Sequence, residues 1–290
     1  MKKTLIHPAT FKLDGGAMFG IIPKPLWSKR IQPDDLNRIL MALRIVLIQT
    51  KNRNILIDTG IGDYHPEKFI HQFEIQSTSS PIATILKDKL GLNPHDITDV
   101  ILTHLHFDHI GGLGTGDNGT TPIFPNATLH INKNHYDYAL SPTLRDSGSF
   151  QDNYFEPLIK SYIDKGQVNF LIENEGTIIE DEGEKITYKT SFGHTPYMIH
   201  PIFDNYIYMA DLVPMSHHIK LPWVMGYDIE PGTTTIYKKR FYDYIIKNNL
   251  SMIFEHDIDI FGGPLEINER GQYQLKVSHP SSGELTQTLI

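Results

Sequence analysis

The chain has 290 residues, the length of roughly one to two globular domains, and it is 40% hydrophobic and 21% charged. Its longest apolar runs, such as Ile45-Val46-Leu47-Ile48, have the length of a strand and fall far short of the roughly 18 residues of a membrane span. The net charge of −8 argues against nucleic acid and anionic membrane surfaces as partners, because both attract a basic protein face.

Cysteine is absent, which excludes disulfides, a thiolate nucleophile and a cysteine–zinc site, and which fits a reducing compartment. Lys2 and Lys3 are followed by only two apolar residues, whereas a secretory signal needs an apolar stretch of about 7–15 residues. We therefore expect a cytoplasmic protein. The sequence has 15 histidines, so any site for a soft metal must be built from histidine and carboxylate.

Strand and helix signals alternate along the chain, and no linker or repeat separates them. Residues 43–49 and 54–58 predict a buried hairpin, and 79–91 predicts a helix with a serine cap, Pro81 in its first turn and Gly91 as terminator. In a helix over 233–248, we expect Tyr237, Phe241, Tyr244 and Ile245 to share one face. Further elements are expected as strands at 99–103, 186–191, 206–210, 251–254 and 273–277, and as a helix at 153–164. This order suggests one domain over residues 1–290, with two sheets covered by helices.

The clearest chemical signal follows the expected strand 99–103, where four candidate ligands fall within six residues: His104, His106, Asp108 and His109. Alternate side chains of an extended segment share a face, so His104 and His106 can reach one ion. A turn after them would carry Asp108 and His109 to a neighbouring position. A single histidine is more often structural than a ligand. Burying four such groups without a metal, however, would leave several polar groups unpaired.

Three more candidate ligands each lie just past an apolar run, namely His194, Asp211 and His256. Side chains at the ends of different strands can converge at one edge of a sheet. We therefore expect these three residues to join the earlier cluster.

These motifs resemble those of the metallo-β-lactamase-fold hydrolases. The segment from His104 to His109, followed by His194, Asp211 and His256, matches the five metal-binding motifs of that family in order. Asp58-Thr59-Gly60 matches its early aspartate motif, and the resemblance covers about residues 40–260. It implies an α+β fold, a four-layer αββα sandwich with the site at one edge of the paired sheets.

The same resemblance implies a centre of two divalent transition-metal ions. The first ion would be held by His104, His106 and His194, and the second by Asp108, His109 and His256, with Asp211 bridging both. Zinc suits these ligands best, and iron, manganese or cobalt are alternatives. Asp58 is open to two interpretations, as a residue that orients a ligand histidine or as a turn-forming aspartate before Thr59-Gly60.

A narrower resemblance concerns the segments 14–20, 23–27 and 221–228, which look like those of quorum-quenching lactonases of the YtnP type. That branch is similar to N-acyl-homoserine lactonases and, more distantly, to methyl parathion hydrolase. One departure stands out. Acyl-homoserine lactonases have a tyrosine three residues after the bridging aspartate, where this chain has Pro214. The usual Gly-His after the third motif is Tyr197-Met198 here, and we assign no role to His200.

Both tryptophans fall in these branch segments and suggest an apolar substrate pocket, which would suit an acyl chain or an aromatic ester. Ordinary packing is the alternative, as is a homodimer contact made by the N-terminal segment 1–40. For His217 and His218, the simpler interpretation is that they lie in a loop at the mouth of the site. The pocket candidates are Met18, Phe19, Trp27, His217, His218, Trp223 and Met225.

We expect a metal-dependent hydrolase in which a hydroxide shared by two ions attacks a lactone or ester carbonyl. Asp108 is the catalytic candidate that orients this nucleophile and passes its proton to the leaving oxygen. The expected substrate is a small molecule, an ester or a lactone similar to an N-acyl-homoserine lactone. The alternatives are an organophosphate, aryl-ester or thioester hydrolase on the same site, and a metal-bound sensor with little turnover.

Overall fold

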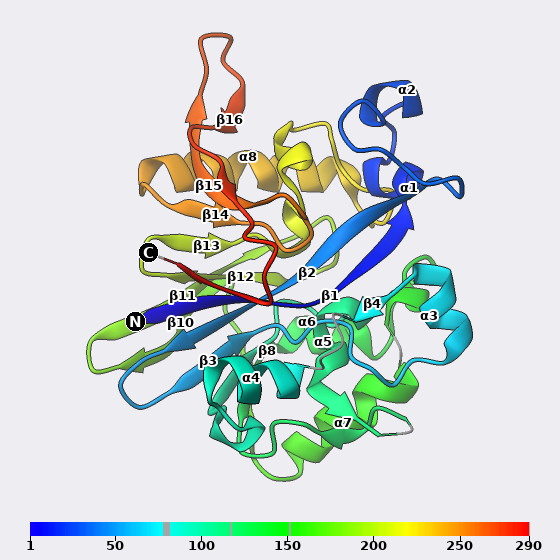
Figure 1. Ribbon diagram of the computed structural model, residues 1–290. Coiled ribbons are helices and arrows are strands. Elements are labelled where there is room, and N and C mark those ends of the chain that lie inside the picture. The colour runs from blue at the N-terminus through cyan, green and yellow to red at the C-terminus, as the bar shows by residue number, and fades with distance from the viewer. Residues whose placement is uncertain (78–81, 117, 151, 290) are drawn as a thin grey trace.

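The computed structural model describes residues 1–77, 82–116, 118–150 and 152–289 of the chain. In these residues it has two large sheets and a small two-stranded one (Figure 1). The first sheet consists of β1 (Lys2–Asp14), β2 (Arg38–Gln49), β3 (Asn54–Ile57), β4 (Gln76–Ser77), β5 (Asp99–Ile101), β8 (Thr128–Asn132), β9 (Val168–Leu171) and β18 (Thr286–Leu289). The second consists of β10 (Glu175–Asp181), β11 (Glu184–Ser191), β12 (Met198–Phe203), β13 (Tyr206–Tyr208), β14 (Ser251–Ile253), β15 (Ile260–Ile267), β16 (Tyr273–Leu275) and β17 (His279–Pro280). The small sheet pairs β6 (Gly114–Thr115) with β7 (Thr121–Pro122).

The described helices surround these sheets, and none is long and apolar enough to cross a membrane. The α-helices are α1 (Gly15–Phe19), α2 (Lys24–Trp27), α3 (Glu67–Phe73), α4 (Ile82–Leu90), α5 (Phe107–Ile110), α6 (Lys133–Ala139), α7 (Asp152–Ile163) and α8 (Pro231–Lys247). Short 3₁₀ turns are η1 (Pro94–Asp96), η2 (Gly111–Leu113), η3 (Ser147–Ser149), η4 (Ala210–Leu212) and η5 (Ser216–Ile219).

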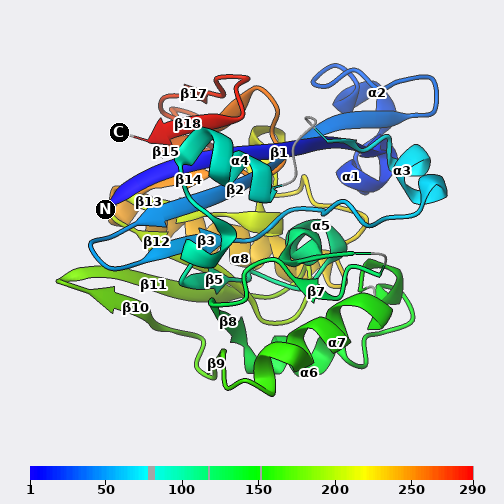
Figure 2. The ribbon, with the colours of Figure 1, turned by 60° about the horizontal axis from the view of Figure 1, so that its bottom comes forward.

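The strand order of the first sheet is β18-β1-β2-β3-β5-β8-β9, with β4 beside β1. The strands β3, β5, β8 and β9 run parallel, so their carboxyl ends lie at one edge. The second sheet follows the order β10-β11-β12-β13-β14-β15-β16, and its only parallel pair among the described strands is β13 with β14. The two chain ends lie together because β1 pairs with β18, as both ribbon views show (Figure 2).

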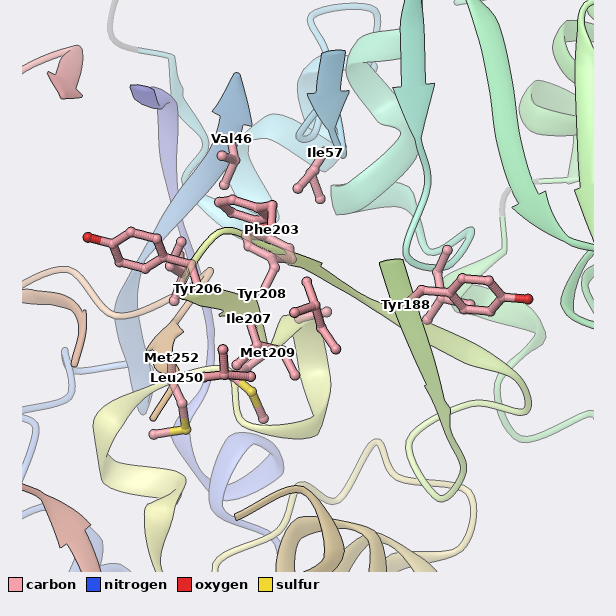
Figure 3. Close-up of a cluster of buried hydrophobic side chains, with 14 of the residues drawn as sticks. Val46, Ile57, Tyr188, Phe203, Tyr206, Ile207, Tyr208, Met209, Leu250 and Met252 are labelled. Carbon is pink, nitrogen blue, oxygen red and sulfur yellow. The ribbon is translucent and has the colours of Figure 1, made fainter. Parts of the chain in front are cut away.

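Alternating apolar residues let the first sheet bury both faces. In β2, Ile45 and Leu47 belong to the buried cluster that includes residues of α4 and α7, while Val46 and Ile48 belong to the cluster shared with the second sheet. Figure 3 shows Val46 and Ile57 pointing toward Phe203 of β12 in this core between the sheets. The helix α8 covers the other face of the second sheet. The layers therefore run helix, sheet, sheet, helix, which confirms the predicted αββα sandwich.

Most predicted elements are present, with shifted ends. The predicted serine cap and Pro81 of the helix 79–91 lie outside the described residues, and α4 is described from Ile82. The expected strand 206–210 stops at Tyr208, because Ala210 begins the 3₁₀ turn η4. The predicted face of α8 packs on the core, with Phe241 and Ile245 buried and Tyr237 and Tyr244 partly buried; Lys238 and Tyr242 are also buried.

The largest difference is β1, a strand of 13 residues that the sequence analysis left unassigned within the N-terminal segment 1–40. Pro8 interrupts its apolar pattern, and proline weakens a strand prediction because it cannot donate to the ladder. The structure accommodates it at an irregularity, where the pairing with β2 shifts register between Ile6 and Ala9. The rest of the segment forms α1 and α2, which pack into a separate buried cluster with Trp223 and Met225.

Candidate metal centre

The segment between β5 and α5 presents the first histidines at the carboxyl edge of the first sheet. His135 holds this segment, because its Nε2 accepts a hydrogen bond from Leu105 N at 2.9 Å and its Nδ1 donates to Pro196 O at 2.7 Å. Both bonds require a neutral ring, and burial lowers the pKa of His135 to about 4. One histidine thus fixes the loop of the first motif to the loop that follows His194.

Four buried side chains meet in a first cluster, with ligand atoms within 4.8 Å of one another: His104, His106, His194 and Asp211. His106 Nδ1 lies 3.2 Å from His194 Nε2, which lies 3.1 Å from Asp211 Oδ2. Burial, together with the neighbouring histidines, holds the pKa of His104 and of His106 well below the usual range. These rings are therefore neutral and have lone pairs to offer a cation.

A second cluster contains Asp108, His109 and His256, all buried. His256 Nε2 lies 3.6 Å from Asp108 Oδ2, and His109 Nε2 lies 3.9 Å from Asp108 Oδ1. Asp211 joins the two clusters, because its Oδ1 is 3.1 Å from His256 Nε2 while its Oδ2 faces His194. Burial alone would raise the pKa of Asp211, but His194 and His256 hold it well below the usual range.

The donor atoms of these clusters fit cations. His104 Nε2 and His109 Nε2 are buried and have no hydrogen-bond partner among the described residues. Unpaired buried polar atoms are costly, and a cation would supply the missing partner. Imidazole nitrogen with carboxylate oxygen is a donor set that suits zinc and related divalent metals.

The ring nitrogens that face away from the clusters have fixed partners, as ligand histidines generally do. Asp228 Oδ1 lies 3.0 Å from His194 Nδ1, and His256 Nδ1 donates to Ala42 O at 2.9 Å. Asp58 Oδ2 lies 3.0 Å from His109 Nδ1. Both interpretations of Asp58 are met at once, since it has a left-handed φ of 57° and also holds a candidate ligand.

Sequence reasoning gave no role to His135, Asp228 or Glu255, although all three contact the clusters or their loops. Asp228 ends the segment 221–228 and is 34 residues from His194, so no local spacing connects them. Glu255 directly precedes His256, and its Oε2 lies 3.0 Å from His109 Nδ1. Burial raises the pKa of Glu255 to about 7, with His109 opposing this shift.

A pocket of about 360 Å³ opens over the two clusters and is lined by His106, Asp108, His194, Asp211 and His256. Its remaining walls are Leu13, Met18, Met41, Gln72, Phe73, Phe107, Arg145, Gly148, Ser149, Met225 and Tyr227. Most of these side chains are apolar. Arg145 and Tyr227 add hydrogen-bond donors on residues with no role in the clusters.

Of the seven predicted pocket residues, Met18 and Met225 line this pocket and the other five do not. Phe19 is buried behind the wall, stacked between Trp27 and His218 at ring distances of 5.3 Å and 5.0 Å. His218 Nε2 bonds to Met18 O, which secures the wall from behind. His217 and Trp223 line a different hollow, beside Arg30 and Lys220. Phe19, Trp27 and His218 are therefore packed behind the wall, whereas His217 and Trp223 lie beside the second hollow.

Pro214 and Tyr197, where the sequence departs from the family pattern, and the nearby His200 have structural roles. Pro214 O accepts a hydrogen bond from His256 N at 2.9 Å. Tyr197 has a left-handed φ of 60° and packs on Phe192. His200 is buried, and its Nε2 bonds to Ser191 Oγ at 2.7 Å, away from both clusters.

Comparison with known proteins places the chain among metal-dependent hydrolases. An N-acyl homoserine lactonase of Bacillus cereus is 25% identical over 239 residues, which are 77% of this chain and 84% of that protein. A solved structure described as a probable metal-dependent hydrolase of Staphylococcus aureus is 27% identical, covers 97% of this chain and 96% of its own, and superposes with a TM-score of 0.82. AidC, a dizinc quorum-quenching lactonase solved with a product bound, shares the fold at 20% identity, 97% and 94% coverage and a TM-score of 0.73. The predicted hydrolase class agrees with these relatives. Since the model of the metallo-beta-lactamase superfamily matches residues 44–245, the chain belongs to that superfamily.

Proposed function

We propose that the protein is a binuclear metal-dependent hydrolase that opens lactones, with a substrate similar to an N-acyl-homoserine lactone. The observation that carries the proposal is the pair of clusters joined by Asp211 at the floor of an apolar pocket. The lactonase of Bacillus cereus and the fold of AidC support the same reaction class.

In this proposal the two clusters are the two metal sites. The first site is His104, His106 and His194, the second is Asp108, His109 and His256, and Asp211 is shared. Two bound divalent ions would lower the pKa of water and polarise the substrate carbonyl, so no serine or cysteine nucleophile is required. The hydrogen bonds from the far ring nitrogens keep each imidazole aimed at its site.

Asp108 is the proposed proton carrier. It lines the pocket at the start of α5, with its carboxylate 3.6–3.9 Å from His256 and His109. As water adds through its oxygen to the carbonyl carbon, Asp108 would accept the proton that water loses. When the ring carbon–oxygen bond breaks, Asp108 would return this proton to the leaving oxygen, which yields the hydroxy acid.

The pocket walls suit an acyl or aryl group beside the reacting carbonyl. Met18, Met225 and Phe107 provide apolar surface next to the clusters. Tyr227 stays protonated at neutral pH because burial raises its pKa to about 12, so its hydroxyl can donate to a substrate oxygen. We propose that Tyr227, in place of the lactonase tyrosine that is Pro214 here, supplies this donor.

The test is proton release in a pH-stat, with metal-reconstituted protein and a panel of N-acyl-homoserine lactones and simple lactones. Asp108→Asn should lower kcat by about 10²–10⁴, the range of a general acid–base group. The loss should be smaller on an aryl ester, because a phenolate leaves without first being protonated. Asp137→Asn, which removes an exposed carboxylate on α6, is the matched control and should be unchanged.

Metal content is measured on each variant, so that loss of an ion is not mistaken for loss of proton transfer. Absence of turnover on every lactone by protein with two bound ions would refute the lactonase proposal. Turnover of organophosphates, aryl esters or thioesters instead would keep the metal centre and change the substrate. Tight lactone binding without turnover would identify a sensor.

A further inference from the structure

Glu255 brings a second carboxylate to His109, whose Nδ1 already contacts the carboxylate of Asp58. Its Oε2 lies 3.0 Å from His109 Nδ1, and Asp58 Oδ2 lies 3.0 Å from the same nitrogen. Neutral imidazole with Nε2 directed at a cation has a single hydrogen on Nδ1. That hydrogen can satisfy one carboxylate well, so the two carboxylates differ in their surroundings.

Asp58 is the satisfied carboxylate. Its Oδ1 accepts from Thr103 N at 2.8 Å and its Oδ2 accepts from Thr103 Oγ1 at 2.7 Å, in addition to the bond from His109. Three donors from the protein thus compensate its charge, and its position is fixed with or without an ion.

Glu255 lacks such donors. It is 0% exposed, and among the described residues its oxygens make no well-aligned hydrogen bond, although Oε2 contacts His109 Nδ1 at 3.0 Å. The nearby Tyr208 hydroxyl donates to Arg44 O at 2.5 Å. The buried Arg44 guanidinium offers a counter-charge, but its hydrogen bonds go to the main-chain oxygens of Phe254 and Asp257 and to a serine hydroxyl.

The carboxylates are distributed unevenly over the two clusters. Four lie within or beside the second cluster: Asp58, Asp108, Asp211 and Glu255. The first cluster has three histidines, the shared Asp211 and one outer carboxylate, Asp228. A cation between Asp108, His109 and His256 would compensate the charge of Glu255 through His109, whose Nδ1 lies 3.0 Å from Glu255 Oε2.

We propose that Glu255 is a positioning residue that acts through His109 and strengthens binding of the cation held by Asp108, His109 and His256. The inference rests on the proposed metal centre. A purely structural glutamate would affect the stability of the protein and leave the affinity for both ions unchanged.

The experiment compares Glu255→Gln, which keeps the shape and removes the charge, with wild type. Zn²⁺ is stripped and then titrated back against a competing chelator, and thermal unfolding is followed with and without Zn²⁺. We expect one of the two Zn²⁺ ions to bind about 10–100-fold more weakly and the other to be unchanged. Because the affinity for one ion falls, the rise in Tm on adding Zn²⁺ should be smaller for the variant than for wild type.

Two further variants make the result specific. Glu255→Asp retains the charge and should keep most of the affinity that Glu255→Gln loses. Asp257→Asn alters the neighbouring buried carboxylate, which accepts from Ser216, Asp259 and Ile260. It should lower Tm equally with and without Zn²⁺.

Unchanged binding of both ions by Glu255→Gln, or equal weakening of both, would overturn the inference. So would a rise in Tm on adding Zn²⁺ that is as large for Glu255→Gln as for wild type. Wild-type protein that fails to bind two ions would instead refute the metal centre itself, which separates the two failures.

Discussion

Removal of the Asp228 carboxylate should weaken binding of one ion, the one proposed for the first cluster. Its Oδ1 is 3.0 Å from His194 Nδ1, and both side chains are at most 2% exposed. A buried charge-assisted hydrogen bond contributes about 1.5–3 kcal/mol, which corresponds to about 10–100-fold in affinity. We therefore expect Asp228→Ala to bind this ion about 100-fold more weakly. Asp228→Asn, whose amide oxygen can still accept from His194, should lose about tenfold.

The assay is competition between the protein and a chromophoric chelator for Zn²⁺, which resolves the two binding steps. Asp243→Asn is the control, because Asp243 pairs with Lys239 on the exposed side of α8, and exposed pairs contribute little. Two binding steps of Asp228→Ala that match those of wild type would refute the reasoning that Asp228 orients His194. The pair Asp228→Ala and Glu255→Gln should weaken different ions.

The remaining predictions concern the backbone, a buried lysine and the pocket. Gly193→Ala should lower the free energy of unfolding by about 2 kcal/mol more than Gly183→Ala. Both glycines have positive φ, but a Cβ added at Gly193 would lie 2.4 Å from Thr234 N, whereas one added at Gly183 would meet nothing within 4 Å. Equal losses in urea unfolding would contradict this. Burial lowers the pKa of Lys238 to about 7 in the folded protein. Between pH 7 and 10 this lysine therefore binds more protons in the unfolded chain than in the folded one, so the free energy of unfolding should rise with pH over that window. In Lys238→Met, the Tm should rise less steeply with pH than in wild type. An unchanged slope would show that other groups cause the pH dependence. Tyr227→Phe should lower kcat/KM for lactones about tenfold, the loss of one hydrogen bond, and an unchanged value would exclude Tyr227 as a donor.

The residues of the clusters could be predicted because each follows an apolar strand. Strand ends are set by local pattern, and neighbouring strands bring their ends to one edge without any further information. The same logic explains why His104 and His106 lie in one cluster and Asp108 and His109 in the other, after the turn into α5.

The residues that support the clusters could not be predicted, because their roles depend on contacts across the fold. His135 reaches Leu105 from α6, and Asp228 reaches His194 from a loop that α8 holds in place. No periodicity signals such a contact. The position of Trp27 and Phe19 could not be predicted for a related reason: they are apolar enough for a pocket, but equally so for the buried cluster behind its wall, where they lie.

The two clusters are supported by different kinds of structure. The second is held from strands and their ends, by Asp58 after β3 and by Ala42 O of β2. The first depends on the loop 221–228, where the Asp228 carboxylate also accepts from Met225 N at 3.3 Å.

That loop is also a wall of the pocket, because Met225 and Tyr227 line it. Gly226 N donates to Ala17 O at 2.7 Å, which ties the loop to α1, and Arg145 donates to Asp228 O at 3.2 Å from the opposite rim. A substitution that reshapes this wall therefore moves the carboxylate that orients His194. Variants of this wall that are selected to accept a different acyl group should therefore bind the ion of the first cluster with altered affinity. Their affinity for the ion of the second cluster should be unchanged, because strands hold the residues of that cluster in place.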